Sequence, residues 1–249
     1  MIYLDKLIHF FYTSNHNLNK KVILKNYIKK KIIIRDKEVL CIFCPPWHVG
    51  GFATSVLRYR IKNKNYSYLT YNIHPHVLSA DYKSTKRYMD NVIKTISDDV
   101  NYYKQKYSFK KIYIFGISLG CLYSFNTAVM NKNINKVILA APGYTLADSI
   151  WSGYSTEKLK EYFINNNLSL EKLEREWASL SPYKNIKNLK DTELTLLISK
   201  RDVLTKYESS KKLIKILKDN KIKLNLDINK NSGHYGTVIR LLVHPKKYM

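Results

Sequence analysis

Three residues of the chain have the types needed for serine-based catalysis: Ser118, Asp202 and His234. A neutral serine hydroxyl is a weak nucleophile, so it needs a base, and a histidine base needs a carboxylate to orient it. Ser118 stands in Gly116-Ile117-Ser118-Leu119-Gly120, a pattern that can expose a serine on a sharp turn between a strand and a helix. We therefore predict acyl transfer, with Ser118 as nucleophile, His234 as base and Asp202 as orienting acid.

The elements predicted around these residues would gather them at one place. A helix is predicted to follow Ser118, over 121–130, and each of the three residues comes after an apolar run typical of a strand. The runs are 111–115, 194–198 and 222–228. In a parallel sheet the loops after the strands lie along one edge, so residues far apart in sequence can meet there.

Predicted strands and helices alternate along most of the chain, which indicates a parallel sheet with helices on both faces. Further strands are predicted at 21–24, 27–34, 39–44, 66–73 and 136–141, and further helices at 1–12, 52–61, 84–107, 207–217 and 237–243. At 249 residues the chain suits one α/β domain. Two helical segments without a strand between them, in 144–182, predict an inserted lid.

The predicted lid is rich in aromatic residues. Ser155 would cap its first helix and Ser169 its second. The aromatic side chains could line an apolar pocket or belong to the core; they are Tyr144, Trp151, Tyr154, Tyr162, Phe163 and Trp177. We predict that Tyr144 and Trp151, together with His48 in the loop after 39–44, contact the substrate.

The formal net charge is +24, from 43 Lys and Arg against 19 Asp and Glu. Such an excess suits a nucleic acid or an anionic membrane surface as partner. The basic residues are nevertheless spread along the whole chain, together with many Asn, Ile and Tyr, as the codons of an AT-rich genome would produce. Two explanations of the net charge stay open: compositional drift, and a functional basic face that begins at 20–35. We predict no specific nucleic acid and a small-molecule acyl substrate, and the sequence does not specify an oligomeric state.

Cys41, Cys44 and Cys121 are too few for a disulfide framework and suit a reducing compartment. Cys41 and Cys44 have the spacing of half a zinc site or of a redox motif. They fall in the strand predicted at 39–44, where residues three apart point to opposite faces and cannot converge on one metal. We therefore predict core cysteines, no metal site and no cofactor.

No apolar run is long enough to span a membrane. The start of the chain, 1–12, is too polar for a signal peptide and has the pattern of a short amphipathic helix. We therefore expect a cytoplasmic protein.

On these residues, the sequence resembles the α/β-hydrolase superfamily over roughly 39–234. The resemblance rests on the Gly-x-Ser-x-Gly motif at 116–120, on Asp202 after a strand, and on Gly233-His234 after the last strand. It implies a three-layer αβα sandwich with an eight-stranded, mostly parallel sheet, a helical lid and a Ser-His-Asp site. The superfamily includes esterases, lipases, thioesterases, peptidases and acyltransferases, so the fold does not select a substrate.

The resemblance also implies two backbone donors for the oxyanion. One would be the N–H of Leu119, directly after the nucleophile. The other would come from the loop after Cys44, where Pro45-Pro46 replaces the usual His-Gly or Gly and proline has no N–H. Trp47 is then the expected second donor. A serine hydrolase acting on an ester or related acyl bond of a small to medium apolar substrate is our first hypothesis. A catalytically silent binding protein and a basic peripheral lipase are the alternatives.

Overall fold

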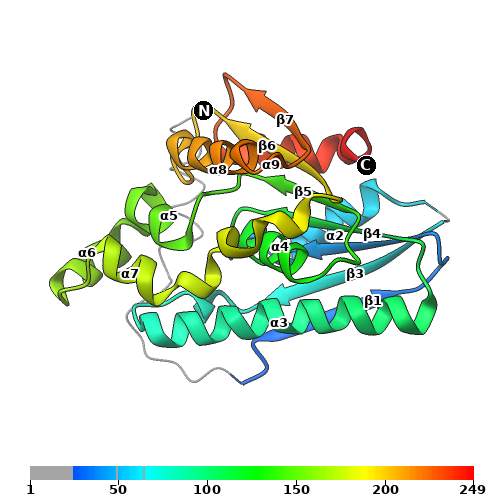
Figure 1. The fold of residues 1–249 in the computed structure, drawn as a ribbon, viewed down its shortest axis with the longest axis horizontal. Helices are drawn as coiled ribbons and strands as arrows, with labels where there is room; N and C mark the ends of the chain where they lie inside the picture. Colours follow the sequence, from blue (N-terminus) through cyan, green and yellow to red (C-terminus); the bar gives the residue numbers. More distant parts are fainter. Residues whose placement is uncertain (1–24, 49, 64) are drawn as a thin grey trace.

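The computed structural model describes residues 25–48, 50–63 and 65–249. Within them, seven strands form one sheet between two layers of helices (Figure 1). The strands are β1 (Ile28–Ile33), β2 (Val39–Cys44), β3 (Tyr66–Ile73), β4 (Lys111–Ile117), β5 (Lys136–Ala140), β6 (Glu193–Ser199) and β7 (Leu224–Asn229). Their order in the sheet is β1-β3-β2-β4-β5-β6-β7, and only the β1–β3 pair is antiparallel. The predicted αβα sandwich with a mostly parallel sheet is thus confirmed.

The described sheet has seven strands instead of the eight expected. The strand predicted at 21–24 and the helix predicted at 1–12 lie outside the described residues. At the opposite edge lies β7, and the alternation of apolar and polar residues over 222–228 predicts a strand that faces water on one side and buries the other. Leu226 and Ile228, on the apolar side, are instead exposed, because among the described strands β7 pairs with β6 alone.

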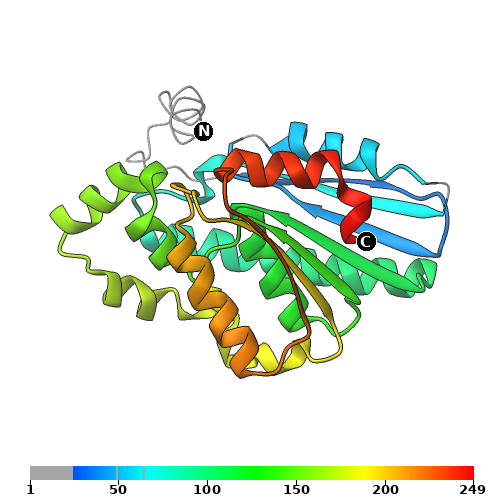
Figure 2. The same ribbon diagram turned by 90° about the horizontal axis from the view of Figure 1, so that it is seen from above.

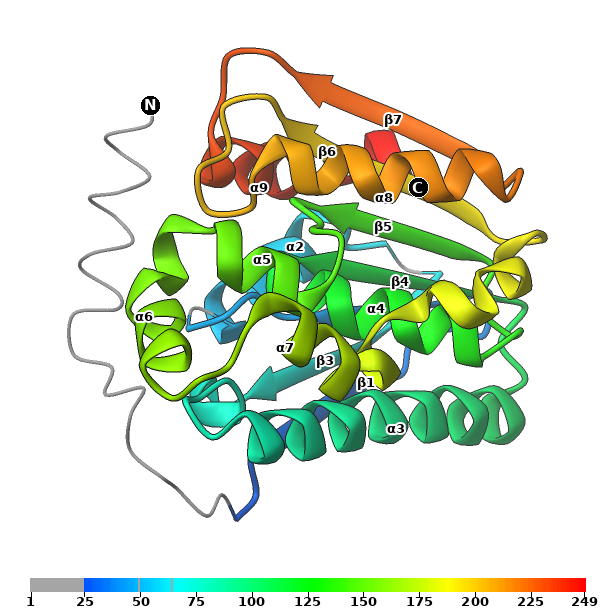
Figure 3. The ribbon, with the colours of Figure 1, turned by 60° about the vertical axis from the view of Figure 1, so that its left-hand side comes forward.

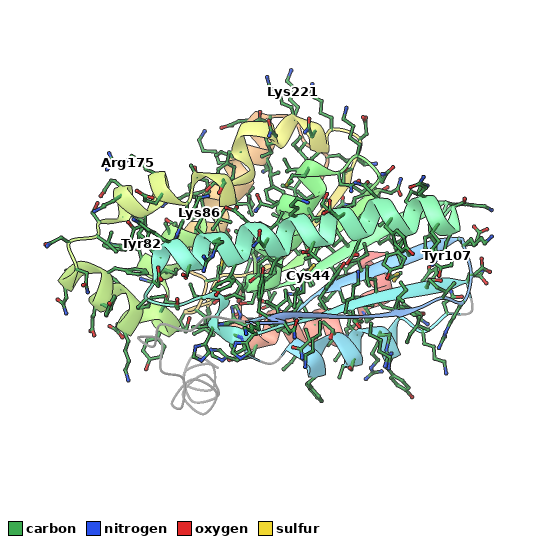
Figure 4. The ribbon with its side chains drawn as sticks, turned by 90° about the horizontal axis from the view of Figure 1, so that it is seen from below. Cys44, Tyr82, Lys86, Tyr107, Arg175 and Lys221 are labelled. Atoms are coloured by element: carbon green, nitrogen blue, oxygen red, sulfur yellow. The ribbon has the colours of Figure 1, made fainter. Side chains whose placement is uncertain are left out.

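The helices divide into two layers (Figure 2). One layer contains α2 (Gly50–Arg60) and α9 (His234–Val243), which pack against each other. The other contains α3 (Tyr82–Tyr107), α4 (Leu119–Met130) and α8 (Tyr207–Asp219). Helix α3 crosses its face of the molecule from Tyr82 to Tyr107 (Figure 4). None of the helices in the described ranges is long and apolar enough to cross a membrane.

Strand β2 has the unbroken apolar sequence of a strand covered on both faces, and all six of its residues are buried. Its two cysteines belong to different sides of the sheet. Cys41 packs with the α2 and α9 layer, whereas Cys44 packs with the α3 and α4 layer. Burial raises the pKa of Cys44 to about 12 and that of Cys41 further, so both thiols stay protonated. Both cysteines are free and belong to the core, as predicted.

Between β5 and β6 the chain forms α5 (Leu146–Ser152), α6 (Glu157–Asn165) and α7 (Leu170–Glu176). Figure 3 shows them together at the end of the sheet toward which the strand arrows point. Ser169 caps α7 as predicted, accepting a hydrogen bond from the amide of Lys172. The predicted capping role of Ser155 is wrong: α5 is capped by Thr145, and the N-cap of α6 is Thr156. The insertion therefore has one more helix than the sequence pattern indicated.

Candidate active site

Ser118 lies between the end of β4 and the first residue of α4. Its backbone has φ 51° and ψ −118°, outside the regions that non-glycine residues ordinarily adopt. Hydrogen bonds hold this conformation on both sides, from the Ser118 amide to the Ala140 carbonyl and from the Cys121 amide to the Ser118 carbonyl. Such strain persists where the surroundings fix it, and it is common at functional sites.

The two glycines of the motif are required by close packing. A Cβ atom on Gly116 would lie 2.7 Å from the Cα of Cys121, in the first turn of α4. A Cβ atom on Gly120 would lie 2.2 Å from the carbonyl oxygen of Cys44, at the end of β2. Only glycine allows the helix to begin this close to both strands.

Asp202 and His234 form a buried pair, although 32 positions separate them in the chain. The Asp202 Oδ2 and His234 Nδ1 atoms are 2.8 Å apart, and the two side chains are 3% and 5% exposed. The other carboxylate oxygen, Oδ1, accepts hydrogen bonds from the amides of Leu204 (2.9 Å) and Thr205 (2.7 Å). The acid is therefore fixed on one side by backbone and aims its second oxygen at the imidazole.

By sequence alone, Asp202 could also have been an N-cap of the following helix. Helix α8 begins only at Tyr207, and its N-cap is Lys206. The bonds from Asp202 close a separate turn before that helix. This turn holds the carboxylate beside His234, so the local hydrogen bonds and the contact with the histidine occur together.

A cavity of about 310 Å³ is lined by both Ser118 and His234. Part of its wall is apolar and comes from α4, α5 and α8: Leu122, Phe125, Leu146, Ile150 and Leu213. On another side it is lined from α2 and α9 by Phe52, Ala53, Val238, Ile239 and Leu242. No Asp, Glu, Lys or Arg is among the described residues that line it. The volume is within the range of small-molecule sites.

The residues predicted for the oxyanion hole lie at this cavity. Leu119 lines it and is the first residue of α4, so its amide belongs to the turn whose N–H groups have no partner within the helix. Trp47 also lines it, and its indole Nε1 donates to the carbonyl of Pro75 at 2.8 Å. His48 has a left-handed φ of 69° and lies against the Trp47 ring, with 4.1 Å between ring centroids.

Of the residues predicted to contact substrate, His48 and Tyr144 line the cavity and Trp151 is not among its described lining residues. Helix α5 instead presents Ile150 to the cavity, while Trp151 lies under the ammonium of Lys160, 5.7 Å from the ring centroid. The other lid aromatics mostly serve the core. Phe163 and Trp177 are buried against each other, whereas Tyr154 is 43% exposed.

Asp227 is another acidic residue before His234, and its place on the polar face of 222–228 predicts a solvated side chain. Its side chain is instead 20% exposed and receives hydrogen bonds from Arg240, Tyr248 and Lys247. Burial acts to raise the pKa of Asp227, but the bonds from Arg240 and Tyr248 outweigh it and hold that pKa below its usual value. Asp227 therefore has a structural role on the α9 side of the sheet.

Two groups of residues at this site were not found from the sequence. The first is the apolar wall of α4, where Leu122 and Phe125 stand three positions apart and so share one face of the helix. The second is Ser199, whose hydroxyl donates to the carbonyl of Ser232 and so fixes the loop that carries His234. A hydrogen bond from the last residue of a strand to a backbone carbonyl 33 positions later has no signature in the sequence.

The strand order, the glycine-framed serine turn and the buried acid-histidine pair define a class of protein, the serine hydrolases of the α/β-hydrolase superfamily. Within that class, the chain belongs to the prolyl oligopeptidase family, whose sequence model matches residues 58–243. No curated protein matches the chain significantly.

Several solved structures share the fold. The acylaminoacyl peptidase of Pyrococcus horikoshii has 17% identity and a TM-score of 0.61, covering 86% of this chain and 36% of that one. An esterase of Pyrococcus furiosus has 16% identity and a TM-score of 0.58, covering 93% and 94%. An acetyl xylan esterase from Paenibacillus sp. R4 has 11% identity and a TM-score of 0.65, covering 89% and 80%. The chain thus spans 36% of the peptidase chain but nearly the whole of the Pyrococcus furiosus esterase.

Proposed function

We propose that the protein hydrolyses a carboxylic ester, or a related acyl bond, of an uncharged and largely apolar substrate through Ser118, His234 and Asp202. The observation that carries this proposal is that Ser118 and His234 line one cavity, with Asp202 bonded to the far nitrogen of His234. The segment 144–182 serves as a lid within a single domain of 1–249, because α5 contributes part of the cavity wall.

The reaction has two steps. Ser118 Oγ attacks the carbonyl carbon while His234 Nε2 takes its proton, and the imidazolium then gives that proton to the departing alcohol. Water attacks the acyl-serine with the same histidine as base, which releases the acid and restores Ser118. Asp202 holds the Nδ1 proton on the histidine throughout. The amides of Leu119 and Trp47 bind the oxyanion, and each such donor is worth about 10²–10³ in kcat.

The lining of the cavity favours a neutral ester. A peptide with a free amino terminus would bring a charged ammonium, and burying it without a carboxylate partner is costly. No carboxylate is among the described lining residues. Leu122, Phe125 and Ile150 offer a surface suited to an acyl chain, and His48 and Tyr144 flank it. The ester preference therefore rests on the cavity of this chain, although its family is named for a peptidase.

A fluorophosphonate probe tests the nucleophile, since it labels an activated serine covalently. We expect labelling of the wild type at Ser118, found by peptide mass spectrometry, and none in Ser118→Ala. A panel of nitrophenyl esters of increasing chain length, compared with aminoacyl nitroanilides that carry a free amine, then tests the substrate class. A folded wild type that is neither labelled nor active would instead indicate the catalytically silent binding protein.

A further inference from the structure

The layer formed by α2 and α9 carries four large apolar side chains that are exposed. Phe52 and Tyr59 stand seven positions apart on α2, so they share one face of the helix, and each is 73% exposed. Ile239 and Val243 stand four apart on α9 and are 55% and 41% exposed. Helices α2 and α9 lie side by side and pack against each other (Figure 2). We call the exposed side of this helix pair, with these four side chains, the α2–α9 face.

The α2–α9 face also has charge of one sign on its own segments. Residues 50–62 and 234–249 contain no Asp or Glu. They contain six basic residues: Arg58, Arg60, Lys62, Arg240, Lys246 and Lys247. The carboxylate that reaches this layer is Asp227 from β7, and it is already bonded to Arg240 and Lys247. The remaining positive charge of the layer is therefore uncompensated by its own helices.

The opposite layer has a different pattern of charge. There, lysines are matched with carboxylates one turn away: Lys86 with Asp90 and Lys94 with Asp98 on α3, and Lys215 with Asp219 on α8. A net charge produced only by compositional drift would affect both layers alike. The absence of acidic residues from 50–62 and 234–249 therefore favours a functional basic face, located on α2 and α9.

The cavity continues into this surface. Phe52 and Ile239 both line the cavity and are more than half exposed, so they form part of its mouth. We infer that the α2–α9 face seats on an anionic lipid surface, with Phe52, Tyr59, Ile239 and Val243 in the boundary between head groups and acyl chains. The basic residues face the anionic head groups, and the mouth of the cavity then opens toward lipid. A nucleic acid would use the charge but would offer no apolar phase to the four exposed side chains.

The test uses the full chain with Ser118→Ala, so that binding is measured without hydrolysis and stands apart from the proposed function. Sedimentation with vesicles of phosphatidylcholine is compared with vesicles of an equal mixture of phosphatidylcholine and phosphatidylglycerol. We expect binding to the anionic vesicles only, and release as salt rises. Binding to a DNA duplex without vesicle binding, or no binding to either, would overturn the inference.

Two double variants avoid the cavity lining. Arg60→Glu with Lys62→Glu changes the charge, and Tyr59→Ser with Val243→Ser changes the apolar contact; each should lower the vesicle partition coefficient about tenfold or more. Matched controls lie in the opposite layer: Lys83→Glu with Lys218→Glu, and Tyr102→Ser with Met130→Ser, all at exposed positions. Equal losses from both layers would show unspecific attraction and overturn the inference. Thermal melts check that each variant is folded.

Discussion

Replacing Asp202 by asparagine tests the proposed mechanism most directly, because the surroundings dictate how the new amide must lie. Oδ1 of Asp202 accepts hydrogen bonds from the amides of Leu204 and Thr205, so the introduced asparagine must keep its carbonyl oxygen there. Its NH₂ group then faces His234 Nδ1, which was 2.8 Å from the carboxylate. Nδ1 must become the acceptor and the proton moves to Nε2. The histidine can then no longer accept the proton of Ser118.

We therefore expect Asp202→Asn to lower kcat by about 10⁴, the cost of the wrong tautomer in serine proteases. Stability should fall by only about 1–2 kcal/mol, because both backbone bonds survive. Hydrolysis of a nitrophenyl ester gives kcat, and chemical denaturation gives the free energy of unfolding. Asp227→Asn is the matched control and should keep kcat within a few-fold. If Asp202→Asn kept a tenth of wild-type kcat, or if Asp227→Asn were the inactive variant, the assignment of the acid would be wrong.

Three further predictions concern stability and specificity. Asp227→Asn should lower the melting temperature by about 2–4 °C at pH 7. Because the pKa of Asp227 is lowered in the folded state, its stabilisation is present above its usual value of 3.8 and is lost as the pH falls through the folded-state value. The difference in melting temperature between wild type and variant should therefore shrink as the pH is lowered below 3.8. Gly120→Ala should lower the free energy of unfolding by about 1–3 kcal/mol or more, because the new Cβ would lie 2.2 Å from the Cys44 carbonyl oxygen. Chemical denaturation measures this loss. Gly51→Ala is the control and should be tolerated, because its Cβ would meet nothing within 4 Å. Phe125→Leu should shift kcat/KM about tenfold toward longer acyl chains by lengthening the cavity, and an unchanged chain-length profile would contradict the acyl-pocket role.

The parallel sheet was predictable because buried strands carry a strong local signal. Strands β2 and β3 have the predicted bounds. The unbroken apolar run of β2 can be satisfied only by cover on both faces of the sheet. The failures occur where tertiary context decides. The period-two pattern over 222–228 predicted a buried side for β7, but β7 is the edge strand of the sheet that the described residues form, and Leu226 and Ile228 stay exposed there. Ser155 is a good capping residue by type, yet the chain places Thr156 at that position.

The proposed site was predictable to the extent that it follows strand ends. Ser118 and His234 come to one cavity because parallel strands deliver their following loops to the same edge. Which aromatic residues face that cavity was not predictable, since Trp151 and Ile150 are adjacent and differ only in the rotation of α5. The solvated role expected for Asp227 failed for a similar reason. Its partners Arg240 and Tyr248 lie in later segments, and their convergence depends on how α9 packs on the sheet.

The two prolines after β2 lie beside the turn that carries the serine. Gly120 brings the first turn of α4 against the carbonyl groups of Cys44 and Pro45, so Leu119 begins its helix beside the loop that contains Trp47. The prolines fix φ at two successive positions, and the indole bond from Trp47 to Pro75 anchors the loop from the far side. Pro45 and Pro46 have no backbone N–H to donate, but they stiffen the segment that leads to the N–H of Trp47. A stiff loop is what an oxyanion donor requires, because a preorganised N–H needs no reorganisation when the charge develops. The two prolines in place of the usual glycine are therefore compatible with catalysis. Where glycine would make the loop flexible, Pro45 and Pro46 hold the backbone before Trp47 rigid.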